Sequence, residues 1–180
     1  MTGHRYFIVN KPVNMVSQFV SGHDVRLLGS INYNFPEGTH AIGRLDKNSE
    51  GLLLVTTDKK ITALLFQGKL PHSRTYLVQV KNKVSPETVL ALAAGITISA
   101  AQGSEYVTKP CEVILLDKPD FIHKPETQLH ENVVYSWLLI TLSEGKFHQV
   151  RKMVAAVNHK CIRLIRISIE DMELGKDMMK

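Results

Sequence analysis

An acidic residue lies between basic residues and glycines in the segment Gly43-Arg44-Leu45-Asp46-Lys47-Asn48-Ser49-Glu50-Gly51. The segment leads directly into the apolar run Leu52–Val55, which predicts a buried strand. Glycine lets a backbone approach a ligand closely, and a buried strand would hold the Asp46 carboxylate at the wall of a cleft. The alternative is a polar turn with a surface salt bridge, which on spacing alone is the more common arrangement.

A tyrosine beside a basic residue opens a second segment of interest. Tyr76 follows Arg74 at the beginning of an alternating pattern that predicts a strand over Thr75–Val80. A ring in that place can stack on a nucleic acid base while the neighbouring cation meets a phosphate. An ordinary strand tyrosine packed in the core is the alternative, and for a single aromatic residue it is the commoner case.

The third segment, Glu144–Met153, is the basic beginning of a helix expected over Lys146–Val157. Its buried face is predicted by the i, i+3, i+4, i+7 spacing of Val150, Met153, Val154 and Val157. His148 and Arg151 then share a flanking edge, where the Arg151 guanidinium could hold a carboxylate and lower its pKa. Because cations are disfavoured at a helix N-terminus, a functional reason is favoured over a solvated helix start.

Basic residues concentrate around these segments. The chain has 22 Lys and Arg against 17 Asp and Glu, a formal net charge of +5. Basic residues gather in Gly43–Lys83 and Glu144–Arg166, whereas acidic residues gather in Glu112–Glu131 and Glu170–Asp177. This segregation indicates one basic surface that faces the phosphates of a polyanion, with two merely solvated faces as the alternative.

The elements that must position these residues form an alternation of strands and helices. Strands are expected over Tyr6–Val9, Leu52–Thr56, Thr75–Val80, Ile96–Ile98, Val113–Leu116, Val134–Leu142 and Cys161–Ile169. Helices are expected over residues 59–67, between the N-cap Ser85 and Gly95, and over Lys146–Val157. The predicted fold is α+β, a mixed or antiparallel central sheet with flanking helices and a central active-site cleft.

Composition excludes several classes of protein. With 180 residues, 44% hydrophobic and 22% charged, the chain fits one globular domain and not a disordered or fibrous protein. No apolar run approaches a membrane span, so we expect a cytoplasmic protein. Histidine and cysteine spacing predicts no metal site.

Together and in this order, the segments resemble the RsuA-type pseudouridine synthases. The resemblance rests on Gly43–Asp46 with Gly51–Leu54, Arg74-Thr75-Tyr76, Glu144-Gly145-Lys146 with Gln149–Met153, and Arg163-Leu164-Ile165-Arg166. Phe7–Pro12 and Ser17-Gln18-Phe19 also look like the beginning of that catalytic domain, so the resemblance covers about Arg5 to Gly175.

The resemblance implies the isomerisation of a uridine in ribosomal RNA to pseudouridine, with no cofactor and no metal. The enzyme would break the N-glycosidic bond, rotate the detached base and rejoin it through a carbon–carbon bond. Within the family, the chain is most similar to members that act on the large subunit, which implies 23S ribosomal RNA or a pre-ribosomal large subunit as the partner. Residues 1–180 are expected to form a single catalytic domain, monomeric and without the appended N-terminal RNA-binding domain of several relatives.

The resemblance also implies roles for individual residues. Asp46 matches the essential aspartate, Tyr76 the tyrosine that stacks on the target base, and Arg151 the basic residue paired with the aspartate. Leu164 matches the apolar residue behind the tyrosine, and Arg44 the arginine that fills the gap left by the displaced base. Further RNA contacts are predicted at Arg74, which stands where relatives commonly have lysine, and at Lys146, His148 and Lys152.

Two alternatives stay open. The first is a sibling synthase that acts on a uridine in small-subunit ribosomal RNA or another RNA. The second is a non-catalytic assembly factor that binds ribosomal RNA. The presence of Asp46, Tyr76 and Arg151 together argues against the second, because a pure binder needs no buried carboxylate amid positive charge.

Overall fold

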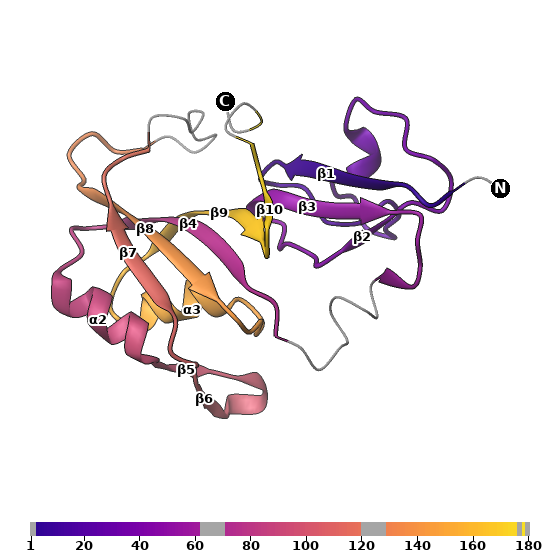
Figure 1. Cartoon of the computed structure of the whole chain (residues 1–180). Coiled ribbons are helices and arrows are strands. Elements are labelled where there is room, and N and C mark those ends of the chain that lie inside the picture. The colour runs from indigo at the N-terminus through magenta and orange to yellow at the C-terminus, as the bar shows by residue number, and fades with distance from the viewer. Residues whose placement is uncertain (1–2, 62–70, 120–128, 176–177, 179–180) are drawn as a thin grey trace.

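The structure is a computed structural model that describes residues 3–61, 71–119, 129–175 and 178. Within these residues, the main element is a mixed eight-stranded sheet (Figure 1). The strands run in the order β1-β3-β9-β4-β8-β7, with β2 beside β3 and β10 beside β9. Their bounds are β1 (Tyr6–Lys11), β2 (His40–Ile42), β3 (Glu50–Thr56), β4 (Arg74–Lys81), β7 (Glu112–Leu116), β8 (Tyr135–Leu142), β9 (Cys161–Ile169) and β10 (Met172–Glu173).

The sheet has two halves that meet between β3 and β9. These strands are parallel and pair only at Glu50 with Ile165 and at Gly51 with Arg166, whereas the other described pairs in this sheet are antiparallel. Gly51 permits this approach, because its φ is +99° and a Cβ at this position would overlap the carbonyl oxygen of Arg166. The segment that follows Asp46 therefore forms the junction of the two halves.

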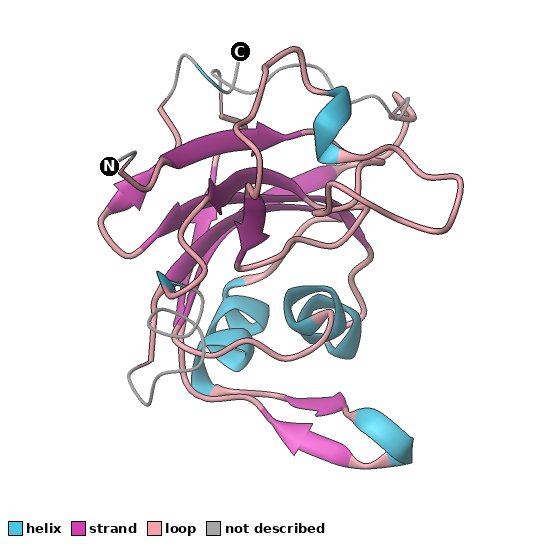
Figure 2. Cartoon of the chain, turned by 90° about the vertical axis from the view of Figure 1, so that its right-hand side faces the viewer, coloured by secondary structure: helices cyan, strands magenta, loops and turns pink. Residues whose placement is uncertain are grey.

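Two helices cover one face of the half formed by β4, β7, β8 and β9 (Figures 1 and 2). They are α2 (Pro86–Ala94) and α3 (Gln149–Ala156). The hydroxyl of Ser85 caps α2 by accepting a hydrogen bond from the amide of Thr88 at 3.2 Å. A separate hairpin, β5 (Thr97–Ser99) and β6 (Glu105–Val107), projects beyond the helices.

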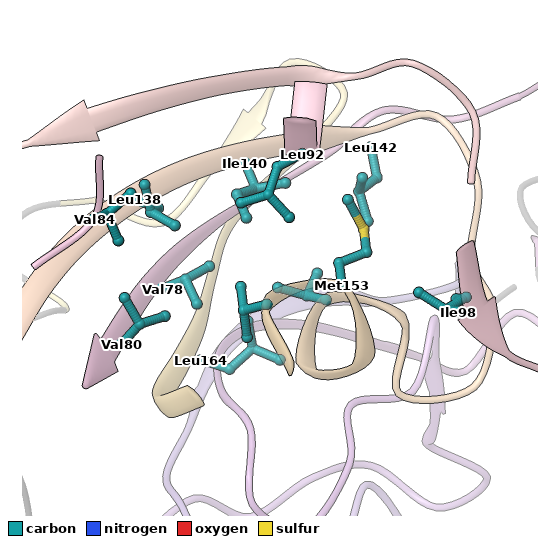
Figure 3. Packing of buried hydrophobic residues seen from close by; sticks show 12 residues of the cluster. Val78, Val80, Val84, Leu92, Ile98, Leu138, Ile140, Leu142, Met153 and Leu164 are labelled. Atoms are coloured by element: carbon teal, nitrogen blue, oxygen red, sulfur yellow. The ribbon is translucent and has the colours of Figure 1, made fainter. Parts of the chain in front are cut away.

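A buried apolar cluster fills the space between α2, α3 and the sheet (Figure 3). Side chains such as Val78, Leu138, Ile140, Met153 and Leu164 are at most 5% exposed. Burial of one such side chain is worth about 1.5–3 kcal/mol, so this cluster fixes α3 against β4 and β9.

Tyr76 links this cluster to a second one. The second cluster lies beneath β1 and β3 and contains Val9, Leu45 and Leu53. The ring of Tyr76 packs against both clusters. The tyrosine is therefore held between the two halves of the molecule.

The α+β class with a mixed central sheet is confirmed, and the remaining differences are local. Helix α3 begins at Gln149 and not at Lys146, because His148 adopts a left-handed conformation with φ of +54°. Of the helix expected over 59–67, residues 62–67 lie outside the described residues. In the described parts of the chain, no helix has the length and apolar character needed to cross a membrane.

Candidate active site

A cavity of about 390 Å³ lies where the two halves of the sheet meet. It is lined by Gly43–Asp46, Arg74, Tyr76, Leu142, Glu144–Val150 and Arg166. Three segments that are far apart in the sequence therefore converge on one concave surface. Of the predicted site residues, the lining includes Arg44, Asp46, Arg74, Tyr76, Lys146 and His148, and it does not include Arg151, Lys152 or Leu164.

Side chains from several elements hold the loop that carries Asp46. The Ser17 hydroxyl donates to the carbonyl of Leu45 at 2.7 Å and accepts from its amide at 3.0 Å. The ammonium of Lys11, at the end of β1, lies 3.4 Å from the carbonyl oxygen of Lys47. Such contacts fix the backbone on both sides of Asp46 before any substrate binds.

Arginines hold the two ends of the same loop. Arg166 Nη2 donates to the carbonyl of Gly43 at 2.6 Å, and Arg151 Nη2 donates to the carbonyl of Asn48 at 2.6 Å. Within the loop, the Ser49 amide donates to the Asp46 carbonyl at 3.0 Å. The Asp46 carboxylate is thus left to face the cavity while its backbone is fixed.

The carboxylate of Asp46 faces a histidine across the cavity. Its Oδ2 lies 3.5 Å from Nε2 of His148, and the two side chains are 39% and 40% exposed. This contact is an ion pair only when His148 is protonated. The left-handed conformation of His148 directs the residue toward the cavity at the point where α3 begins.

Arg166 is the buried cation of the site, and its role was missed at the sequence level. It is 2% exposed, and its Nε donates to the carbonyl of Leu52 at 2.8 Å. Burial lowers the pKa of Arg166, whereas the neighbouring Tyr76 and Asp46 favour its charged form. An arginine stays protonated under these conditions, so Arg166 supplies permanent positive charge beneath the cavity. A signal was available, because an arginine in an apolar strand pattern must find partners when buried.

The expected pairing of Arg151 with the Asp46 carboxylate is corrected by the structure. Arg151 reaches the carbonyl of Asn48, and among the described residues the ion pair of Asp46 is the one with His148. The reason is geometric: His148 occupies the cavity side at the beginning of α3, so Arg151, one turn later, meets the outer end of the loop. Arg151 therefore contacts the loop backbone two residues after Asp46 and not the carboxylate itself.

The structure places Tyr76 beside the arginine on the adjacent strand. Tyr76 on β4 is paired in register with Arg166 on β9, and both residues line the cavity. Leu164 pairs with Val78, so it lies further along the same sheet face. It is 5% exposed and belongs to the cluster against which Tyr76 packs. Leu164 is therefore a core residue, and its expected place behind the tyrosine stays a prediction.

The other predicted RNA contacts surround the cavity. Arg74 lies against Gly145, where a Cβ would be 2.6 Å from its Nη1. Arg44 is exposed at the cavity wall. Lys146 lies over the ring of Tyr106, with 4.4 Å between Nζ and the ring centroid. Lys152 donates to the carbonyl of Ser99 at 2.7 Å, which places it outside the cavity beside the hairpin.

A buried ion pair fixes the junction on which the cavity is built. Arg163 donates to both oxygens of Glu50, from Nε at 3.0 Å and from Nη2 at 2.8 Å. Their side chains are only 5% and 7% exposed. Lys11 lies close by, and burial lowers its pKa to about 8 against the opposing effect of Glu50 and Asp46. This set of charges ties the beginning of β3 to β9 and was not assigned a role from the sequence.

The arrangement offers a carboxylate, an aromatic ring and several cations around one cavity. A carboxylate so placed can attack an electrophilic carbon or accept a proton. Within the described residues, no three His, Cys, Asp or Glu side chains gather as a metal site. The ring and the positive charge suit a base and its phosphates.

Comparisons with known proteins agree with this chemistry. A family model described as RNA pseudouridylate synthase matches residues 5–156. "Ribosomal large subunit pseudouridine synthase E" of Vibrio parahaemolyticus is 32% identical, over 97% of this chain and 71% of its own length. "Ribosomal small subunit pseudouridine synthase A" of Yersinia pestis is 30% identical, over 99% of this chain and 67% of its own length.

A solved structure supports the same relationship. The structure described as "Crystal structure of pseudouridylate synthase" superimposes with a TM-score of 0.77 and 28% identity. The match covers 98% of this chain and 67% of that chain. The mixed central sheet of this chain therefore has the fold of a solved pseudouridylate synthase.

Proposed function

The chain belongs to the RNA pseudouridylate synthase family, and from this premise we propose that it isomerises a uridine in large-subunit (23S) ribosomal RNA to pseudouridine. It is an RNA pseudouridine synthase and therefore an isomerase. The choice of RNA and the roles of the individual residues are the proposed part. One observation carries the proposal: Asp46, Tyr76 and Arg166 converge on a single cavity at the junction of the sheet.

The substrate must enter this cavity as a flipped-out nucleotide. A base that is stacked in folded RNA hides its glycosidic bond, and flipping it out costs a few kcal/mol. Stacking on an aromatic side chain such as Tyr76 returns about 1–3 kcal/mol per base. Phosphate contacts with Arg44 and Arg74 at the cavity wall supply the remainder.

Asp46 carries the chemistry at the sugar, as a nucleophile or as a base. Arg166, which stays charged, lies beneath the cavity that the Asp46 carboxylate faces. The position of this carboxylate must be fixed, and the contacts of Lys11, Ser17 and Arg151 with the loop backbone fix it. Tyr76 orients the base, and the pairing of β4 with β9 places it beside Arg166 at the cavity.

The choice of the large-subunit RNA rests on sequence likeness. The Vibrio parahaemolyticus relative that bears a large-subunit name matches 97% of this chain. The segments Ser49-Glu50-Gly51 and Ser136–Leu142 are also similar to that group. In the structure, the first of these segments contains the junction residues Glu50 and Gly51.

A uridine in small-subunit RNA is the second candidate. The Yersinia pestis relative that bears a small-subunit name is 30% identical over 99% of the chain, which favours it as the alternative. The two candidates are separated by incubating the protein with 23S and 16S transcripts that carry tritium at uridine carbon-5. Release from 23S RNA alone is expected, whereas release from 16S RNA alone would establish the alternative. Binding without release from either transcript would point to an assembly factor.

A further inference from the structure

A second cavity of about 590 Å³ lies between the β5–β6 hairpin and the beginning of α3. We call it the hairpin groove. From the hairpin, Ile98, Ala100, Ala101 and Tyr106 line it, and Lys146, Phe147 and Lys152 line it from the other side. Figure 1 shows the hairpin beyond α3, at the end of the molecule away from β1 and β2. A cavity of this volume falls in the range of about 300–1,000 Å³ typical of small-molecule sites.

The hairpin groove adjoins the active-site cavity. Lys146 and Phe147 line both of them. The ring of Phe147 is stacked on that of His148, with centroids 3.9 Å apart and an interplanar angle of 16°. His148 in turn contacts the carboxylate of Asp46 at 3.5 Å. A strand of nucleotides that left the active-site cavity along these rings would reach the groove.

Phe147 is unusually exposed to solvent for a phenylalanine. It is 73% exposed, although it lies beside the active-site cavity and not in a remote loop. Its cationic neighbour is Lys152, whose Nζ lies 5.6 Å from the ring centroid. An exposed ring beside a lysine can stack on a base while the cation meets the adjoining phosphate.

The walls of the groove are fixed in advance. Glu144 receives hydrogen bonds from the hydroxyl of Tyr106, from the amide of Lys109 at 2.9 Å and from Nε2 of Gln149 at 2.7 Å. On the other side, Lys152 is tied to the hairpin through the carbonyl of Ser99 at 2.7 Å. These bonds join the hairpin to α3, so the groove does not depend on a ligand for its shape.

We propose that the hairpin groove binds the base of a nucleotide adjacent to the target uridine, stacked against Phe147. The apolar wall of Ile98 and Ala101 would cover the base, and Lys146 and Lys152 would neutralise the flanking phosphates. The lysines and the position next to the active-site cavity favour RNA over an apolar peptide or a second copy of the chain. This inference rests on the proposed function, since it requires RNA in the active-site cavity.

The test combines a protein variant with a modified RNA. Phe147→Ala is compared with Phe147→Trp and with Leu90→Ala, a control at a residue that is 69% exposed on α2. Each protein is measured by filter binding and by tritium release on the ribosomal RNA fragment that wild type modifies. The same fragment is also made with an abasic site on either side of the target uridine.

We expect Phe147→Ala to weaken RNA binding by about 5- to 100-fold, and Phe147→Trp to retain it. One of the abasic RNAs should weaken binding of wild type by a similar factor and should weaken binding of Phe147→Ala no further. If wild type releases tritium but Phe147→Ala binds RNA as well as Leu90→Ala does, the groove proposal is wrong and the proposed function stands. The same holds if the abasic site weakens binding of Phe147→Ala as much as it weakens binding of wild type. If wild type itself releases no tritium from any ribosomal RNA, both proposals are overturned. Self-association of wild type that Phe147→Ala abolishes would assign the groove to a second copy of the chain.

Discussion

The guanidinium of Arg166 on β9 donates a hydrogen bond of 2.6 Å to the carbonyl of Gly43, three residues before Asp46. The same side chain donates to the carbonyl of Leu52 on β3 at 2.8 Å. One buried cation thus spans the junction of the two halves of the sheet and fixes the loop that carries the carboxylate. We therefore expect the geometry of the site and the stability of the fold to depend on the same residue.

Arg166→Met should lose both activity and stability. The substitution removes the charge beneath the cavity and leaves two carbonyls without their donor, which costs about 2–5 kcal/mol of unfolding free energy. Chemical denaturation measures that loss, and single-turnover tritium release measures the activity. Arg166→Met with wild-type stability and turnover would contradict the role given to this residue.

Arg151→Met should lower turnover far more than RNA binding. Its single described hydrogen bond holds the carbonyl of Asn48, so its loss loosens the loop by a fraction of an ångström without removing the cavity. Misplacement of a reacting group by about 1 Å can cost about a hundredfold in rate. Filter binding and turnover are compared in the same variant, and equal losses in the two assays would count against the positioning role.

Gly51→Ala should destabilise the junction between the two halves of the sheet. A Cβ at this position overlaps the backbone of Arg166, and the φ of +99° strains any residue with a side chain. Gly29→Ala is the matched control, because nothing lies within 4 Å of its Cβ position. The first variant should lose about 2–4 kcal/mol of stability and the control less than about 1 kcal/mol in thermal and denaturant unfolding. Similar stabilities would show that the junction tolerates the side chain.

The stability of the protein should depend on Lys11 at alkaline pH. Burial lowers its pKa from the ordinary value of 10.5 to about 8 in the folded state. Between these values the unfolded chain binds more protons than the folded chain, so the contribution of Lys11 to stability rises as pH rises from about 8 to about 10.5. Subtracting the profile of Lys11→Met from that of wild type cancels the other titrating groups. A difference that stays flat or falls over this window would show that the ammonium is not destabilised by burial.

That the segments around Asp46, Tyr76 and His148 line one cavity could be predicted from the sequence. The buried contacts of Arg163 and Arg166 could not. The motifs around Asp46 and Tyr76 indicated segments that line the cavity, because their residue types and order are specific when taken together. The contact of Arg166 with the Asp46 loop could not be predicted, because the alternation in β9 shows which residues share a face but not which loop lies opposite. The ion-paired residues Glu50 and Arg163 are 113 residues apart in sequence, and no local pattern relates them.

Local backbone geometry accounts for the remaining differences. The beginning of α3 was placed at Lys146 because the apolar spacing of the helix gives no sign of the left-handed His148. That single conformation decides which of His148 and Arg151 faces Asp46. The strand around Ile98 was expected, but its partner Glu105–Val107 is too short to produce a recognisable alternation.

We expect the carboxylate of Asp46 to perform the chemistry in a cavity whose loop is held through its backbone and not through that carboxylate. Asp46→Asn keeps the size of the side chain and removes its charge, and at 39% exposure the change should alter stability by no more than about 0.5 kcal/mol. The decisive measurement is tritium release from carbon-5 of uridine in a 23S transcript, with filter binding on the same samples. Wild type should release tritium. Asp46→Asn should bind the RNA normally but should release tritium at least about a thousandfold more slowly. Release by Asp46→Asn at the wild-type rate would contradict the account.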